Sequence, residues 1–212
     1  MPAANEESWN GLTGTVGGAG AIIAAGANGD MFRYSVNVID GVDAYASYSP
    51  SDGTFAIKSS QSFGVKYTGI DGLEVGYATG DNNEQVAVTN GNATNSAAGA
   101  DIENTAMYLK YTFDSFTVGV QENSSDSETA SADVDFSAFG ISYAVSEDIS
   151  VSYAASKMDL EGMSEDQEHS AIGVSFTSGS MTLSGSHHKH ENAGGTAASD
   201  NTAYEVNLAF AF

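Results

Sequence analysis

Three neighbouring histidines are the residues that most invite a chemical interpretation. His187, His188 and His190 fall within four positions of one another, and Glu191 follows them directly. Imidazole nitrogens and carboxylates are the ligands that zinc takes in proteins. Adjacent residues of a strand point to opposite faces, however, so this spacing divides the set between two faces. Lys189 adds a cation that repels a metal ion. We expect a solvated strand end here and no metal site.

The same segment raises the question of hydrolysis. A serine nucleophile needs a histidine within hydrogen-bonding reach and a third polar group that orients the imidazole. Ser186 and His188 are two residues apart, which places both on one face of a strand, but a serine-rich strand produces such a pair by chance. The chain has no cysteine, no Gly-x-Ser-x-Gly elbow and no His-Glu-x-x-His helix. We expect no enzyme, no turnover and no cofactor.

Acidic side chains dominate the charge. The chain has 28 Asp and Glu residues against 6 Lys and Arg residues, a formal net charge of −22 over 212 residues. Nucleic acids and anionic surfaces need a basic patch on their protein partner, so this composition excludes nucleic acid as a partner. Cations, basic molecules and water remain. The absence of cysteine fits an oxidising compartment.

No segment has the ~20 consecutive apolar residues that a membrane-spanning helix needs, and the longest apolar run is about 21–25. Met1 is followed by Pro-Ala-Ala-Asn-Glu-Glu, which lacks the basic and apolar regions of a signal peptide. We expect that a signal peptide has been removed upstream or that the chain begins partway through a gene.

The residues above must be positioned by strands, because the end of the chain alternates strictly. Tyr204, Val206, Leu208, Phe210 and Phe212 occupy every second position, with small or polar residues between them. In an extended strand this spacing puts the large apolar side chains on one face. Similar segments with this period recur along the chain. We expect eleven strands, at about 31–39, 42–49, 60–68, 73–80, 105–113, 116–123, 134–144, 148–157, 169–177, 180–189 and 203–212.

Two properties of these strands indicate the fold class. Short turns, such as Asp40-Gly41, alternate with long polar loops, as in a barrel whose two ends face different compartments. The face opposite the large residues consists of Gly, Ala, Ser, Thr, Asn and a few charges, with almost no Leu, Ile or Val. A β-sandwich would need large apolar residues on its inner face. The sequence therefore predicts an all-β, antiparallel transmembrane β-barrel with its apolar side toward lipid.

An odd number of strands needs an explanation, since antiparallel bacterial barrels have even numbers. One possibility is that 12–25 forms a twelfth strand of a small complete barrel, although its Gly-Gly-Ala-Gly run breaks the alternation. The other is that the chain is a fragment, because an eleven-stranded sheet with two open edges is not viable alone in lipid.

The ending on Phe212 resembles the C-terminal strand of Gram-negative outer-membrane β-barrels. From residue 1 onward, the chain resembles the C-terminal two-thirds of a sixteen-stranded general-diffusion porin. The resemblance implies that residues 1–30 are a constriction loop, that 31–212 are barrel strands, and that five strands are missing. It also implies a homotrimer in the outer membrane, surrounded by the lipid bilayer.

The resemblance further implies where charge selects solutes. Acids of the constriction loop would face a basic wall across the narrowest point of the pore. We expect Glu6, Glu7 and Asp30 on the acidic side and Arg33 on the basic side. The alternative for Glu6 and Glu7 is that they are simply solvated loop acids.

Alternation places a further set of polar side chains on the face toward the lumen. Lys66 and Glu74 flank the turn at 69–72 and could pair. With so few basic residues the lumen should favour cations. We expect a water-filled channel for passive diffusion of small hydrophilic solutes, and alternatively a surface adhesin or receptor with a closed interior. The expected pore-lining residues are Asp43, Lys66, Glu74, Lys110, Gln121 and Glu205.

Overall fold

A single antiparallel sheet makes up most of the computed structural model, which describes residues 32–50, 59–82, 88–90, 93–95, 101–128 and 133–211. Its eleven strands follow one another in chain order, so every neighbour in the sheet is also a neighbour in sequence. The predicted all-β class and the eleven strands are confirmed. The strands of this sheet are β1 Phe32–Ile39, β2 Val42–Ser49, β3 Ser60–Ile70, β4 Leu73–Asn82, β7 Ile102–Phe113, β8 Phe116–Ser127, β9 Val134–Ala144, β10 Ile149–Leu160, β11 Gln167–Ser178, β12 Met181–Glu191 and β13 Asn201–Phe210.

Two smaller elements lie in the long connections. The segment expected as a loop between β4 and β7 contains a short hairpin, β5 Val88–Asn90 and β6 Ala93–Asn95, which forms its own two-stranded sheet. A 3₁₀ turn, η1 Ala193–Gly195, lies between β12 and β13. In the part of the chain that the structure describes, no helix has the length and apolar content to cross a bilayer.

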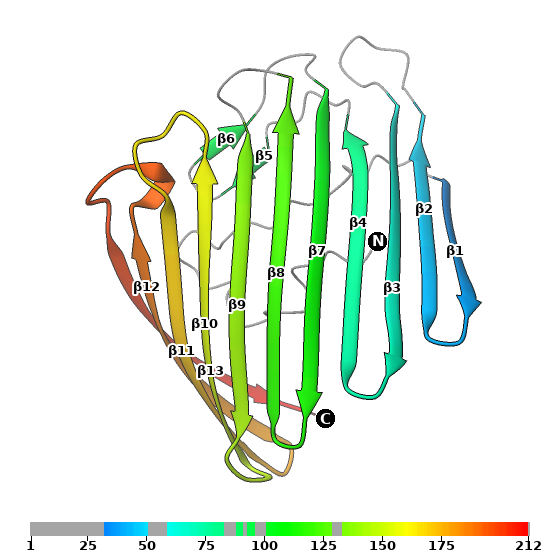
Figure 1. Ribbon diagram of the computed structural model, residues 1–212. Helices are drawn as coiled ribbons and strands as arrows, with labels where there is room; N and C mark the ends of the chain where they lie inside the picture. The colour runs from blue at the N-terminus through cyan, green and yellow to red at the C-terminus, as the bar shows by residue number, and fades with distance from the viewer. Residues whose placement is uncertain are drawn as a thin grey trace.

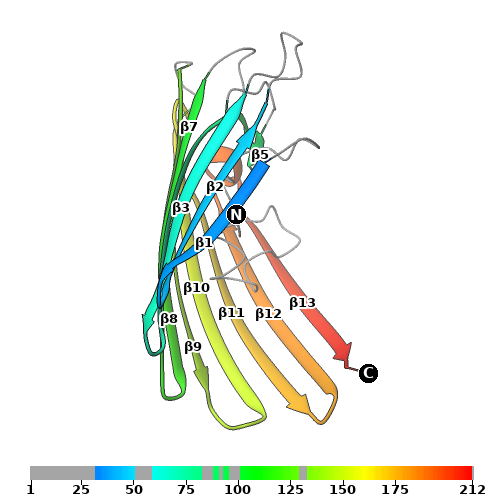
Figure 2. The same ribbon diagram turned by 90° about the vertical axis from the view of Figure 1, so that its right-hand side faces the viewer.

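The large sheet curls into an open trough, with β1 and β13 at its two edges (Figures 1 and 2). Each interior strand has a ladder on both sides, so its backbone N–H and C=O groups are bonded within the sheet. This arrangement is what a lipid environment demands. Curling a sheet crowds the side chains of its concave face, and that face is here called the inner face.

Tight turns at one end of the trough fix the register of the hairpins. Gly41 and Gly72 follow aspartates and adopt φ of 75° and 73°, in the left-handed region that glycine enters most easily. Their carbonyl oxygens accept hydrogen bonds from the N–H groups of Thr68 (2.7 Å) and Thr112 (2.8 Å) in the following hairpins. A β-carbon at Gly72 would overlap the Thr112 carbonyl oxygen. The Asp-Gly pairs therefore set both the turn and the contact with the next strand.

The outer face carries large apolar side chains that the fold leaves uncovered. Tyr204 and Val206 are 80% and 76% exposed, and similar residues follow on every strand. Near the tight turns, the rings of Tyr111, Phe113 and Phe116 stack in sequence, with centroids 5.6 and 5.5 Å apart. Aromatic residues at the edge of such a surface are typical of a barrel at a bilayer boundary. We call this surface the apolar band.

The apolar band ends before the strands do. Toward the long-loop end of β7–β12, the outer face becomes polar and charged, so these strands extend past the band. The charged outer residues there are Glu103, Glu122, Asp126, Asp135, Lys157, Asp159, Glu168, Lys189 and Glu191.

The inner face is buried at the same level and carries large apolar side chains among polar ones, which corrects the expectation of a uniformly small and wettable inner face. Five buried residues of β9 and β10 form an apolar cluster there: Val134, Phe136, Ala138, Met158 and Leu160. The physical reason is that the outer face contacts lipid along the apolar band and water beyond it. Where the outer face contacts water, its side chains are polar and the packed interior supplies the apolar contacts.

A lysine on each face tests which face meets lipid. Val174 is on the apolar band and Ser175 is next to it on the inner face. We expect Val174→Lys to destabilise the protein by ~2–4 kcal/mol, the cost of a basic side chain near the bilayer midplane. The control Ser175→Lys should cost less than ~1 kcal/mol. Urea-induced unfolding in lipid vesicles measures both, and equal costs would contradict the assignment of the faces.

Candidate functional site

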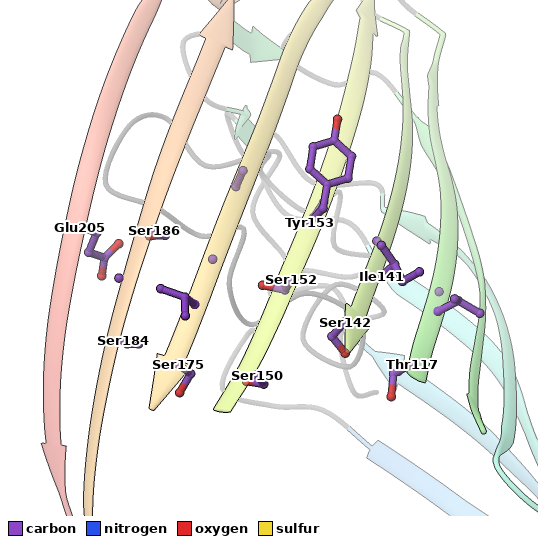
Figure 3. A pocket seen from close by; sticks show the side chains of 18 of the residues that line it. Thr117, Ile141, Ser142, Ser150, Ser152, Tyr153, Ser175, Ser184, Ser186 and Glu205 are labelled. Carbon is purple, nitrogen blue, oxygen red and sulfur yellow. The ribbon is translucent and has the colours of Figure 1, made fainter. Parts of the chain in front are cut away.

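A wall of small hydroxyl side chains crosses the inner face from β8 to β13. The ladder registers place Ser142 opposite Ser152, Ser152 opposite Gly173, and Gly173 opposite Ser186. These residues line a hollow of about 350 Å³, together with Glu205 on β13 (Figure 3). Ser142, Ser152 and Gly173 alternate in sequence with large apolar residues of the outer face, whereas Ser186 lies between Gly185 and His187. The same two-residue period that builds the apolar band thus produces a smooth, neutral and hydrophilic inner wall.

Charged side chains enter the inner face on β1–β4. Asp43 lies directly opposite Lys66, and its Oδ1 accepts a hydrogen bond from Nδ2 of Asn37 at 3.1 Å. Arg33 lies on β1 opposite Ser47. Both positions agree with the alternation. Glu6, Glu7 and Asp30 lie outside the described residues.

Glu74 lies directly opposite a lysine other than Lys66. The register places it opposite Lys110, whereas Lys66 lies opposite Asp43 on one side and Gly76 on the other. Glu74 is two residues from Gly76, the residue opposite Lys66, so Lys66 and Glu74 are diagonal neighbours on the inner face. The directly opposed acid–base neighbours are Asp43 with Lys66 and Glu74 with Lys110.

Tyr108 fixes the Glu74 carboxylate. Its hydroxyl donates to Glu74 Oε1 at 2.7 Å, and its ring lies over Gly76, where a β-carbon would overlap the ring atom Cε1. Gly76 is opposite Tyr108 in the ladder. The glycine therefore makes room for the aromatic ring, and the ring carries its hydroxyl to the carboxylate.

Gln121 and Glu205 have contrasting surroundings on the inner face. Gln121 is only 1% exposed and lies between Tyr108 and Ala138 in the ladder, so it belongs to the packed long-loop end and not to a wet wall. Glu205 lines the hollow, lies opposite Ser186, and accepts a hydrogen bond from Nδ2 of Asn207 at 2.6 Å.

A histidine cluster lies on the inner face of β11 and β12, on the long-loop side of the hydroxyl wall. His169 on β11 lies beside His188 and His190 of β12, and the three are 4%, 2% and 4% exposed. Nδ1 of His188 is 3.3 Å from Nε2 of His169, and Nε2 of His188 is 2.8 Å from Oγ of Ser186. His187 points to the opposite face, where its ring contacts Tyr204 at 4.6 Å between centroids. The alternation thus divides the original set, and the ladder adds His169.

The position of His169 beside His190 could have been predicted from the sequence by counting residues from the β11–β12 turn, which alternation within one strand does not use. The tight turn joins Ser178 to Met181, which pair directly. Residues equally far from that turn must face each other. His169 precedes Ser178 by nine residues (178 − 169) and His190 follows Met181 by nine (190 − 181), so the register brings them together.

The cluster lies outside the apolar band, at the level of the outer-face charges Glu168 and Lys189. Burial first, and then the charges of His188 and His190, lower the pKa of His169 from 6.5 to about 4. An unfolded histidine takes up its proton near 6.5, so the packed cluster is most stable above that pH and loses stability as the pH falls toward 4. His169 is neutral at pH 7. The described ranges contain no group of three or more His, Cys, Asp or Glu side chains placed to hold a metal ion.

Comparisons with known proteins agree with this geometry. A family model described as Gram-negative porin matches residues 2–169. Among solved structures, the chain is similar to OmpT of Vibrio cholerae (17% identity, TM-score 0.59), OmpF of Salmonella typhi in complex with daunomycin (12%, 0.65) and a mutant of the Rh. blastica porin (18%, 0.53). These alignments cover 85%, 86% and 86% of this chain but only 64%, 62% and 55% of the others. The chain thus spans less than two thirds of their length. No curated protein matches the sequence.

A methyl group at Gly76 tests the support of Glu74. We expect Gly76→Ala to destabilise the protein by ~1–3 kcal/mol, because the added β-carbon would overlap the buried ring of Tyr108, which would have to shift. Gly185→Ala is the matched control, since its β-carbon would have nothing closer than the Glu205 carbonyl oxygen at 3.8 Å. Urea unfolding compares the two. A Gly76→Ala cost no larger than that of the control would show that Tyr108 does not depend on this contact.

Proposed function

Because this chain belongs to the Gram-negative porin family, we propose that it forms part of a water-filled channel through which small hydrophilic solutes diffuse passively. The chain is an outer-membrane porin. One observation carries the proposal: the same strands present large apolar side chains to one side and hydroxyl groups to the other. Lipid solvates the first surface and water the second.

The hydroxyl wall supports diffusion without tight binding. Ser, Thr and Gly side chains project little into the lumen, and their hydroxyls exchange hydrogen bonds with water at little cost. No cofactor or covalent step is needed for transport of this kind. A wall of this chemistry suits sugars, amino acids and hydrated ions alike.

We attribute the cation preference more to the acidic residues at the long-loop end of the channel than to the residues of its wall. The charged inner-face side chains of the described strands are three acids and three bases, so the wall is close to neutral. At the long-loop end, acids such as Asp133, Glu165 and Asp200 outnumber the bases, in keeping with the net charge of −22. Exposed charges are screened over ~10 Å at 0.1 M salt, so the preference should weaken as salt increases. The six inner residues are Arg33, Asp43, Lys66, Glu74, Lys110 and Glu205.

Two further features remain proposals. Residues 1–30 would supply the constriction, with Glu6, Glu7 and Asp30 opposite Arg33. The assembly would be a homotrimer, and the structure of Vibrio cholerae OmpT that is described as a trimer form supports this.

A closed interior is the second candidate, and the apolar cluster of β9 and β10 favours it. Residues such as Phe136 and Met158 pack on the inner face where an open pore would be wet. A barrel closed at that end would serve as a surface adhesin or receptor.

Ion selectivity tests the charge argument. In a KCl gradient across a planar bilayer, reversal potentials should show preference for K⁺. Glu205→Gln should reduce the permeability ratio about twofold, because one charge at ~8 Å in water contributes ~0.5 kcal/mol. Ser184→Ala is the control, a neutral change on the same wall, and should leave the ratio unchanged. Clear anion preference of the unaltered protein would refute the proposal.

Solute uptake separates the open channel from the closed receptor. Liposomes containing the protein should swell in an isotonic sugar solution. Ser152→Trp should slow the swelling severalfold because the indole projects into the hollow, whereas Val151→Trp on the outer face should not. Absence of swelling with the unaltered protein would support the closed interior.

A further inference from the structure

Three side chains on the inner face form one hydrogen-bonded line. Ser186 Oγ lies 2.8 Å from Nε2 of His188, and the other nitrogen of that ring, Nδ1, lies 3.3 Å from Nε2 of His169. The two imidazole rings are nearly parallel, at 6°, with centroids 5.4 Å apart. A serine in contact with a histidine, itself held by a third group, is the arrangement that activates serine nucleophiles. The sequence offered the first two members, and β11 supplies the third.

The direction of these bonds decides whether the serine is activated. In the tautomer that activates the serine, neutral His169 carries its proton on Nδ1, and its Nε2 accepts the Nδ1–H of His188. Nε2 of His188 is then free to accept the Ser186 proton. Nδ1 of His169 is buried without a hydrogen-bond partner. The neighbouring His190 ring is nearly perpendicular to the His169 ring, at 75°, with centroids 5.9 Å apart.

Ser186 is accessible whereas its base is shielded. Ser186 is half-buried and lines the 350 Å³ hollow, as Figure 3 shows together with Glu205 across the ladder. His188 is 2% exposed, so water does not compete for its contact with the serine. The Glu205 carboxylate disfavours anionic reagents and favours neutral or cationic ones.

We propose that Ser186 is an activated serine that small, neutral acyl or phosphonyl electrophiles modify covalently when they enter the hollow. In the acyl case Oγ of Ser186 forms a bond to the carbonyl carbon of an aryl ester, and Nε2 of His188 takes the hydroxyl proton. The bond from that carbon to the phenol oxygen breaks, and His188 returns the proton to the leaving phenolate. The products are an ester of Ser186 and a free phenol. His188 acts as the base, and His169 is a positioning residue.

The fold favours a stoichiometric modification over turnover. β12 has ladders with both β11 and β13, so the backbone N–H groups around Ser186 are engaged in the sheet. They cannot form the oxyanion hole that speeds both halves of a hydrolase reaction. The acyl group therefore stays on Ser186 and narrows the hollow. This inference concerns the reactivity of one side chain and is independent of whether the channel is open at its long-loop end.

A neutral fluorophosphonate and p-nitrophenyl acetate are the probes, with peptide mass spectrometry of the folded protein in detergent. We expect one label per chain on Ser186, none in Ser186→Ala, and a rate at least ~100-fold lower in His188→Gln, the usual contribution of a general base. Ser152→Ala and Ser184→Ala leave the hollow open and are the matched controls. Labelling of Ser186 no faster than of Ser152 or Ser184 would overturn the proposal.

His169 is tested by its effect on the pH profile. In the unaltered protein the labelling rate should level off at high pH, since the base is a histidine, whereas an ordinary serine would react in proportion to hydroxide. His169→Gln keeps an acceptor for Nδ1–H of His188 and should retain the plateau. His169→Leu removes that acceptor and should lower the rate at the plateau. A rate proportional to hydroxide in the unaltered protein would overturn the proposal even if the His188 variant failed to fold.

Discussion

The structure depends on one constraint. When the backbone of a strand is hydrogen-bonded to a neighbour on both sides, only the side chains on its two faces can differ. The ladders of the eleven-stranded sheet engage the backbone of each interior strand, and side chains alternate with a period of two. Val174 therefore meets lipid while Ser175 meets the lumen. Successive residues thus face lipid and the lumen in turn, and this alternation determines the face on which each functional side chain lies.

Alternation and turn chemistry predict the fold from the sequence, but they do not predict which side chains of the site are neighbours. The Asp-Gly turns and the periodic apolar residues predicted the eleven strands and the inward direction of Asp43, Glu74 and Glu205. The neighbour of each side chain depends on register across two turns, so the positions of Lys66 opposite Asp43 and of His169 beside His190 were not predicted. The apolar cluster around Phe136 was not expected, because the polarity of a face changes along a strand where the bilayer ends.

Three zones follow one another along the inner face. Opposed acids and bases occupy β1–β4 and β7, small hydroxyls occupy β8–β13, and buried apolar and histidine side chains occupy the long-loop end. The polar side chains of the first two zones can exchange hydrogen bonds with water, as the proposed channel requires. The third excludes water, which lowers the pKa of His169 and shields His188. The hydroxyl-lined wall and the shielded imidazole pair thus lie on the same sheet, because its strands extend from the lipid bilayer into water.

The direct test of this account is a cysteine scan along β10, which the absence of native cysteine permits. Single cysteines at 150–154 would be reacted, in lipid vesicles, with a water-soluble thiol reagent and with a bilayer-soluble one. The account predicts strict alternation, with Ser150, Ser152 and Ala154 reacting from water and Val151 and Tyr153 from lipid. Equal reaction of both sets with either reagent, or protection of 151 and 153 from both, would contradict it.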